Sequence, residues 1–382
     1  MRAEPRYSEP FLREDLKTKM LFLGGPRQVG KTTLALRLLG NASKNHPAYL
    51  NWDFPASRKK ILAADLPAAE RIIVLDEIHK FKRWRNLVKG MYDQLGEQHS
   101  IVVTGSARLD YYRRGGDSLQ GRYHYHRLHP FSLNEFSRDA SRKDLDLLLK
   151  FGGFPEPLFS GSETKWRRWQ LERTSRVINE DVRDLENIRE ISLMGLLADM
   201  LPSRVGAPLS LQALRNDLEV SHDSVRRWVD VFENLYFCFR VPPYGVSGVK
   251  AVKKEQKLYL WDWSMIEQPG FRFENMVASQ LLKYCHFLQD TDGFRMELRY
   301  LRNVDEKEID FVVLKEKKPL FAVECKTGER NISGAISYFA PRTPIPVFYQ
   351  VHLGEKHRTA KIGGKKIEIV PFQRWAKAMK FP

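Results

Sequence analysis

The sequence predicts a multidomain α/β protein, in which a phosphate-binding unit comes first, a helical region second and another α/β unit last. Three observations support this prediction. A glycine-rich loop lies between an apolar run and a helix-forming run near the N-terminus, residues 140–200 are rich in Leu, Arg, Glu and Asp, and strand-like segments return after residue 257. The length of 382 residues fits two or three domains. We expect domain boundaries at 1–139, 140–200, 201–256 and 257–382.

The glycine-rich loop has the spacing of a phosphate-binding loop. The apolar run Met20-Leu-Phe-Leu-Gly-Gly25 is typical of a buried parallel strand, and it leads into Gly25-Pro-Arg-Gln-Val-Gly-Lys-Thr32, which matches G-x-x-x-x-G-K-[ST]. Backbone N–H groups of such a loop surround phosphate oxygens. We expect Lys31 to reach the β- and γ-phosphates and Thr32 to hold Mg²⁺. The predicted ligand is therefore ATP with Mg²⁺, contacted by Gly25, Pro26, Arg27, Gln28, Val29, Gly30, Lys31, Thr32 and Thr33.

Acidic and hydroxyl side chains follow the next apolar runs. Arg71-Ile-Ile-Val-Leu-Asp-Glu77 has the Walker B pattern of four apolar residues and two acids. At the carboxyl end of a parallel strand, Asp76 is placed to hold Mg²⁺ directly or through water, and Glu77 to orient and polarise the attacking water. Ser100-Ile-Val-Val-Thr-Gly-Ser106 predicts a third buried strand, whose Thr104 or Ser106 is a candidate to sense the γ-phosphate.

Charge is concentrated at the two ends of the chain. The 63 Lys and Arg residues exceed the 47 Asp and Glu residues by 16. Residues 1–139 have a net charge of +9, residues 140–239 of −2 and residues 240–382 of +9. A surplus of this size favours a polyanionic partner, with nucleic acid ahead of an anionic membrane, although many cytoplasmic proteins are basic without such a partner. We expect DNA contact mainly in the C-terminal region.

Cysteine usage and hydropathy exclude several classes of protein. Cys238, Cys285 and Cys325 lie far apart and form no C-x-x-C pair, which argues against a disulfide framework or a cysteine zinc site and fits a reducing cytoplasm. No apolar run approaches the ~18 residues of a transmembrane helix. The polar N-terminus lacks a signal-peptide pattern. We therefore expect a cytoplasmic protein without a membrane partner.

Several motifs occur together in a distinctive order. They are Gly-Pro-Arg-Gln-Val-Gly-Lys-Thr at 25–32, Leu-Asp-Glu at 75–77, Thr-Gly-Ser at 104–106, Leu-Gln-Gly-Arg at 119–122, His-Pro-Phe-Ser-Leu-Asn-Glu-Phe at 129–136 and Gly-Gly-Phe-Pro at 152–155. In this order they resemble the prokaryotic AAA-superfamily ATP-binding proteins with a C-terminal domain of unknown function. The resemblance covers most of the chain and implies a P-loop ATPase core of the AAA type.

The resemblance also implies a candidate arginine finger. AAA-type catalysis commonly takes an arginine from a neighbouring subunit to neutralise charge in the transition state, which would make the protein a homo-oligomer. Arg122 is the first candidate, followed by Arg108 and Arg113. Each of the three is equally well interpreted as an ordinary surface arginine.

Three histidines near this position suggest a metal site. His124 and His126 share one face of the alternating run Tyr123-His-Tyr-His-Arg-Leu128, and His129 follows. No carboxylate stands at a matching spacing, so we favour surface histidines on a strand over a metal site.

The middle of the chain predicts a winged helix. Two helical runs, 209–218 and 224–235, flank a short turn with capping residues. The helical spacing of Trp228, Val231 and Leu235 indicates core positions. Arg226 and Arg227 could enter a DNA groove, and the lysines that follow could form a basic wing against phosphates. The alternative is a connector that only packs between domains, and the local net charge leaves both open. The wing lysines are Lys250, Lys253, Lys254 and Lys257.

The C-terminal region contains Asp310 and the string Glu324-x-Lys326, on a predicted order of helix, strand and hairpin. With this pattern the region resembles the PD-(D/E)xK nucleases, which implies a restriction-endonuclease-like α/β domain. Asp310 and Glu324 would bind one or two divalent metal ions through oxygen ligands. Lys326 shares a strand face with Glu324 and would position or activate a water against a phosphodiester. Glu274 on the preceding helix could add a third carboxylate. The alternative is a retained fold that only binds DNA or a partner.

Two functions are consistent with these features. The first is a Mg-ATP-dependent, DNA-associated ATPase with a metal-dependent nuclease domain. The second is a nucleotide-controlled regulatory or scaffold protein, in which a silent nuclease fold binds a protein partner. Salt-sensitive DNA binding would count against the second function.

Overall fold

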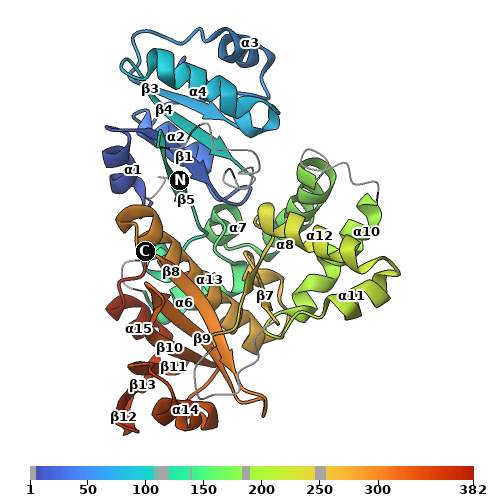
Figure 1. Ribbon diagram of the computed structural model, residues 1–382, viewed down its shortest axis with the longest axis vertical. Helices are drawn as coiled ribbons and strands as arrows, with labels where there is room; N and C mark the ends of the chain where they lie inside the picture. Colours follow the sequence, from blue (N-terminus) through green and yellow to red (C-terminus); the bar gives the residue numbers. More distant parts are fainter. Residues whose placement is uncertain are drawn as a thin grey trace. The chain divides into compact units, whose positions relative to one another are not determined.

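Figure 1 shows the computed structural model, which describes residues 6–106, 109, 119, 121–137, 140–182, 190–245 and 255–382. The chain divides into two compact units. The first comprises Met1–His129, Asn179–Ile188 and Asn234–Tyr236, and the second comprises Pro130–Ile178, Arg189–Glu233 and Phe237–Pro382. Within the described residues, no helix is both long and apolar enough to cross a membrane.

The described part of the first unit contains a five-stranded parallel sheet with the order β2-β3-β4-β1-β5. Its strands are β1 (Met20–Gly24), β2 (Tyr49–Asn51), β3 (Ile72–Asp76), β4 (Ser100–Gly105) and β5 (Tyr123–Arg127). The buried strands predicted at 20–25, 71–77 and 100–106 are confirmed as β1, β3 and β4. Because the strands are parallel, their carboxyl ends share one edge of the sheet.

One short helix precedes β1, and others connect β1, β2, β3 and β4. They are α1 (Glu9–Asp15), α2 (Lys31–Leu38), α3 (Pro55–Ala63), η1 (Ile78–Lys80) and α4 (Trp84–Leu95). An apolar core lies between the sheet and the helices α3, η1 and α4, where Phe22 of β1 stacks on Tyr123 at 4.1 Å between ring centroids and meets Trp84 at 5.5 Å. This packing fixes the strand whose carboxyl end leads into the glycine-rich loop.

The second unit begins with helices. They are α5 (Leu133–Phe136), α6 (Arg142–Phe151), α7 (Pro155–Ser160), α8 (Glu163–Arg176), α10 (Ile191–Met200), η3 (Leu201–Arg204), α11 (Leu211–Leu218) and α12 (His222–Asn234), and the π-helix η2 (Val177–Asp181) follows α8. Ser141 caps α6 through a reciprocal pair of hydrogen bonds with Asp144. The predicted pair of helices in the middle region is present as α11 and α12. Trp228, Val231 and Leu235 are buried, as predicted.

An antiparallel strand pair follows these helices. It consists of β6 (Cys238–Val241) and β7 (Lys257–Leu260). The predicted wing residues Lys250, Lys253 and Lys254 lie outside the described residues. Lys257 does not lie on an exposed wing, because it is completely buried.

A six-stranded mixed sheet, within the described residues, completes the second unit (Figure 1). In chain order, the elements of this part of the unit are η4 (Trp263–Met265), α13 (Pro269–Asp292), β8 (Met296–Arg302), β9 (Glu308–Lys315), β10 (Lys318–Lys326), α14 (Gly334–Phe339), η5 (Ala340–Arg342), β11 (Val347–His352), β12 (Arg358–Ile362), β13 (Lys365–Pro371) and α15 (Phe372–Ala378). The strand order is β12-β13-β11-β10-β9-β8. Strands β8, β9 and β10 are antiparallel, and β11 is parallel to β10.

Candidate functional site

The glycine-rich loop connects β1 to α2 at the carboxyl edge of the parallel sheet. Gly25 has a φ of +149°, and a Cβ atom there would lie 2.4 Å from the backbone oxygen of Leu128. Gly30 precedes α2 with a φ of +104°. Any other residue at these two positions would be strained or would collide with the backbone. The loop is therefore held close to the end of β5, with α2 starting at Lys31.

Lys31 lies inside the curve of this loop. Its Nζ donates hydrogen bonds to the backbone oxygens of Gly25 and Pro26, both at 2.8 Å. Burial lowers the pKa of Lys31, while the negative charges of Glu77 and Asp76 act against this shift. The structure thus brings the predicted phosphate-binding lysine next to both acids of the predicted Walker B motif.

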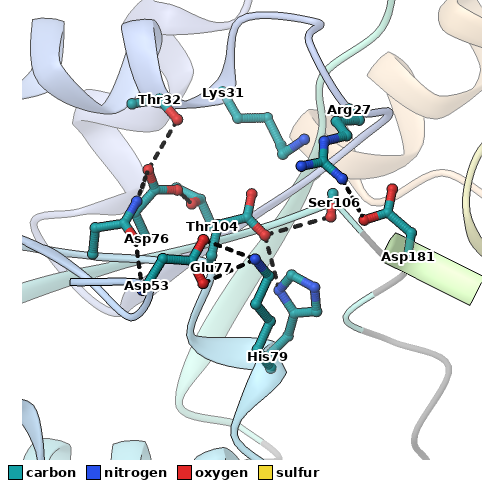
Figure 2. A network of polar contacts seen from close by, with 12 residues as sticks. Arg27, Lys31, Thr32, Asp53, Asp76, Glu77, His79, Thr104, Ser106 and Asp181 are labelled. Carbon is teal, nitrogen blue, oxygen red and sulfur yellow. Dashed lines mark hydrogen bonds and ion pairs between the residues drawn. The ribbon is translucent and has the colours of Figure 1, made fainter. Parts of the chain in front are cut away.

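Asp76 ends β3 and is surrounded by hydroxyl groups (Figure 2). Its Oδ2 accepts hydrogen bonds from Thr32 Oγ1 at 2.9 Å and from Tyr49 OH at 2.5 Å, and its Oδ1 accepts one from Thr104 Oγ1. Thr32 and Asp76, the two predicted Mg²⁺ ligands, are therefore in direct contact. The hydroxyl of Thr104, one of the two candidates for contact with the γ-phosphate, donates its hydrogen bond to Asp76. Sequence reasoning did not find Tyr49, because a tyrosine in an apolar strand is usually interpreted as a core residue.

Glu77 follows Asp76 in the left-handed backbone region, with a φ of +55°. Its Oε2 lies 3.4 Å from Ser106 Oγ and 3.5 Å from His79 Nδ1 (Figure 2). Burial raises the pKa of Glu77, and the charge of Asp76 adds to this effect. Of the two hydroxyl residues predicted on β4, Ser106 is the one that lies beside Glu77. His79 was not predicted, although its position two residues after Glu77 is visible in the sequence.

Arg27 of the glycine-rich loop pairs with two acids from a distant part of the chain. Its Nη1 lies 2.8 Å from Asp181 Oδ1, and its Nη2 lies 2.6 Å from Glu180 Oε2. Both acids belong to η2, and they lie in the segment Asn179–Ile188, which is part of the first unit like Arg27. No local pattern in the sequence indicates this pairing, because the partners are about 150 positions apart.

The predicted arginine-finger residue Arg122 lies just before β5. Its Nε lies 2.8 Å from Asp93 Oδ1 on α4. Because β5 runs parallel to β1, Arg122 lies at the amino edge of the sheet, opposite the glycine-rich loop of its own chain. Arg108 and Arg113 lie outside the described residues.

Two of the three histidines differ from the surface positions expected for them. His126 and His129 are buried, and His126 Nε2 lies 2.5 Å from Asp15 Oδ2. Our expectation of surface histidines was therefore wrong for these two, since alternation along β5 turns His126 towards α1. In the part of the chain that the structure describes, no group of three or more His, Cys, Asp or Glu side chains is arranged to hold a metal ion.

A second group of polar side chains lies in the second unit. Asp310 on β9 accepts a hydrogen bond from the backbone N–H of Cys325 at 2.7 Å, and Lys326 Nζ lies 2.7 Å from Glu324 Oε1 on the neighbouring strand β10. Ser333 Oγ donates to the same Oε1 at 3.1 Å. Among the described residues, the buried Oε2 atom of Glu324 has no hydrogen-bond partner. Burial raises the pKa of Glu324 to about 7, and the charge of Asp310 contributes.

Lys257 lies among the acids of this group. Its Nζ contacts Glu308, lies 3.4 Å from Glu274 Oε1 and lies 4.0 Å from Asp310 Oδ1. Tyr259 OH donates to the same Oε1 of Glu274 at 2.8 Å. Burial and the charge of Asp310 raise the pKa of Glu274 to about 8. The predicted role of Lys257 on a basic wing is therefore wrong, because β7 directs this ammonium into a buried cluster of carboxylates.

Comparison with protein families agrees with the geometry of the first unit. Residues 17–137 match the family model described as "AAA domain". This part of the chain is therefore similar to AAA domains, and it has the phosphate loop and the Walker B strand that are typical of P-loop ATPases of the AAA type. Residues 142–268 and 269–375 match two models, each described as a domain of unknown function.

Relatives of the chain are similar over much of its length. An uncharacterized protein of Methanocaldococcus jannaschii is 23% identical across 94% of this chain and 89% of the relative. An uncharacterized protein of Mycobacterium tuberculosis is 23% identical across 70% of this chain, which spans 60% of that relative. Among solved structures, AMPPCP-bound DnaA from Aquifex aeolicus is similar at 15% identity and a TM-score of 0.33, over 60% of this chain and 87% of DnaA.

Proposed function

We propose that the AAA domain binds Mg-ATP and hydrolyses it. The observation that carries this proposal is the 2.9 Å contact between Thr32 and Asp76, beside Lys31 and Glu77 at one edge of the sheet. Hydroxyl and carboxylate oxygens are the ligands that Mg²⁺ prefers, so the donor set fits the metal. The tight glycine loop fits phosphates, because its backbone can approach them closely.

In this proposal each side chain has a distinct role. Residues 25–33 bind the phosphates, Lys31 neutralises the β- and γ-phosphates, and Thr32 with Asp76 holds Mg²⁺, which supplies further charge neutralisation. Glu77 orients a water against the γ-phosphorus and accepts its proton while the bond to ADP breaks. The raised pKa of Glu77 favours this role, because a base works best when its pKa approaches the ambient pH.

Phosphate release and nucleotide binding, measured on matched variants, test this proposal. Lys31→Ala should weaken nucleotide binding and abolish turnover. Glu77→Gln should bind Mg-ATP normally but turn it over about 100-fold more slowly or worse. Lys59→Ala on α3, an exposed lysine outside the site, is the matched control and should behave as wild type. Equal turnover in wild type and Glu77→Gln would contradict the proposed role of Glu77.

We propose a second activity for the second unit, namely metal-dependent cleavage of DNA at Asp310, Glu324 and Lys326. Among the described residues the buried Oε2 of Glu324 has no hydrogen-bond partner, and this favours the proposal, because a metal ion would supply the partner that this oxygen lacks. The net charge of +9 over residues 240–382 favours a nucleic-acid substrate. Since Glu274 is engaged by Lys257 and Tyr259, we assign one metal ion to Asp310 and Glu324 and leave Glu274 as a neighbour.

A cleavage screen tests the second activity. Wild-type protein with Mg²⁺ or Mn²⁺ is incubated with duplex, single-stranded and branched DNA and with RNA, with and without ATP. Cleavage that disappears in Lys326→Ala and Asp310→Ala, while ATP turnover persists, supports the proposal. If every substrate stays intact, the nuclease activity is excluded, and a nucleotide-controlled scaffold that binds a protein partner becomes the better interpretation.

A further inference from the structure

The Arg27–Asp181 pair joins the phosphate loop to a residue that no phosphate-loop pattern includes (Figure 2). Asp181 is only 6% exposed, and Arg27 is three-quarters buried. Glu180, the second partner of Arg27, is 53% exposed. The ion pair with Asp181 is therefore shielded from solvent, whereas the pair with Glu180 is screened by water.

Among the described residues, the leading charges that act on Asp181 have opposite effects. Arg27 and Lys31 stabilise its negative charge, whereas Glu77 and Glu180 oppose it. Burial raises the pKa of Asp181 to about 6, and the charge of Glu77 adds to this effect. At neutral pH the Asp181 carboxylate is therefore mostly ionised and paired with Arg27, but burial destabilises its ionised form.

We propose that Asp181 is a positioning residue that competes with nucleotide phosphate for the Arg27 guanidinium and thereby lowers the affinity of the site for Mg-ATP. This inference rests on the proposed binding of nucleotide by the AAA domain. A phosphate group is the stronger competitor, because it carries more charge and offers several oxygens to the planar guanidinium. When Arg27 turns to phosphate, the buried Asp181 loses its main partner and faces added negative charge, so part of the binding energy is lost.

Removal of the Asp181 charge should therefore tighten nucleotide binding. Asp181→Asn keeps the shape and a hydrogen-bond acceptor for Arg27 but removes the charge. We expect its Kd for Mg-ATP to fall about 5- to 50-fold below that of wild type at pH 7.5, the usual range of coupling between sites. Glu180→Gln is the matched control, because it removes the exposed partner of the same guanidinium. Its Kd should change by less than about threefold.

The pH dependence separates this role from a purely structural one. Below about pH 6 Asp181 takes up a proton and releases Arg27 in the wild type as well. The ratio of the wild-type Kd to the Asp181→Asn Kd should therefore shrink towards one as pH falls from 8 to 5.5. The titration of ATP itself cancels in this ratio, since both proteins bind the same ligand.

The experiment is equilibrium binding of Mg-ATP by the full chain, with thermal unfolding of every variant to show that it folds. In an Arg27→Met background, Asp181→Asn should no longer change the Kd. Unchanged or weaker binding by Asp181→Asn, or a ratio that does not vary with pH, would overturn the inference while nucleotide binding that depends on Lys31 stands. Failure of the wild type itself to bind Mg-ATP would overturn the proposed function and this inference with it.

Discussion

The Lys283 ammonium lies 2.6 Å from the Glu135 carboxylate, and these side chains are only 2% and 3% exposed. Glu135 belongs to the His-Pro-Phe-Ser-Leu-Asn-Glu-Phe motif at 129–136, which we had grouped with the ATPase motifs. From Pro130 onward, however, this segment belongs to the second unit, where Asn134 Nδ2 donates to the backbone oxygen of Ala376 at 2.8 Å. The match to the AAA family model ends at residue 137, so its last residues belong to the second unit.

The first prediction concerns this buried ion pair. Glu135→Gln should lower the free energy of unfolding by about 3 kcal/mol, because it leaves the Lys283 ammonium buried without its ionised partner. Glu135→Gln combined with Lys283→Met should be less destabilised than the sum of the single variants. Urea unfolding of the four proteins measures this difference. Strictly additive losses would show that the two charges do not stabilise each other.

The second prediction concerns Tyr49, which donates a 2.5 Å hydrogen bond to Asp76. Tyr49→Phe keeps the ring in the core but removes the group that orients the carboxylate. We expect the apparent affinity for Mg²⁺ in the ATPase reaction to fall about tenfold, as is usual for residues that position a metal ligand. The Kd for ATP without metal should stay the same. A loss of ATP affinity without metal would instead indicate a disturbed phosphate loop.

The parts of the fold that could be predicted from the sequence are those that depend on residues close together in the chain. The strand that ends at Asp76 and the helix that contains Trp228 follow from apolar periodicity and loop chemistry within about ten residues. The prediction for Lys257 was wrong, because the sequence does not distinguish a buried lysine from an exposed one after a basic run. Only the pairing of its strand shows that Lys257 is buried. Asp181 was missed for the same reason, since only the tertiary fold brings it to Arg27.

The third prediction concerns Lys257 as the cation of the buried acid cluster. Lys257→Met should lower the free energy of unfolding by about 3 to 5 kcal/mol, because Glu274, Glu308 and Asp310 lose their common counter-charge. Millimolar Mn²⁺ should then raise the melting temperature of the variant more than that of wild type. Lys318→Met, which changes an exposed lysine on β10, is the control and should show neither effect. Equal responses to Mn²⁺ would contradict the interpretation of Lys257 as the resident cation.

The fourth prediction concerns stability against pH at Asp181, measured without nucleotide. The pKa of this carboxyl is about 6 in the folded protein, above its ordinary value of 3.8, so the folded state binds the proton more tightly than the unfolded state. The stability that protonation confers is therefore complete below about pH 4 and is lost as pH rises through 6. Asp181→Asn has no proton to lose at this position, so its stability does not fall in this way. At pH 7.5 the free energy of unfolding of the variant should therefore exceed that of wild type by about 2 to 3 kcal/mol. At pH 4 the two proteins should unfold alike. Urea midpoints over this range measure the difference, and a constant difference would mean that Arg27 keeps Asp181 ionised throughout.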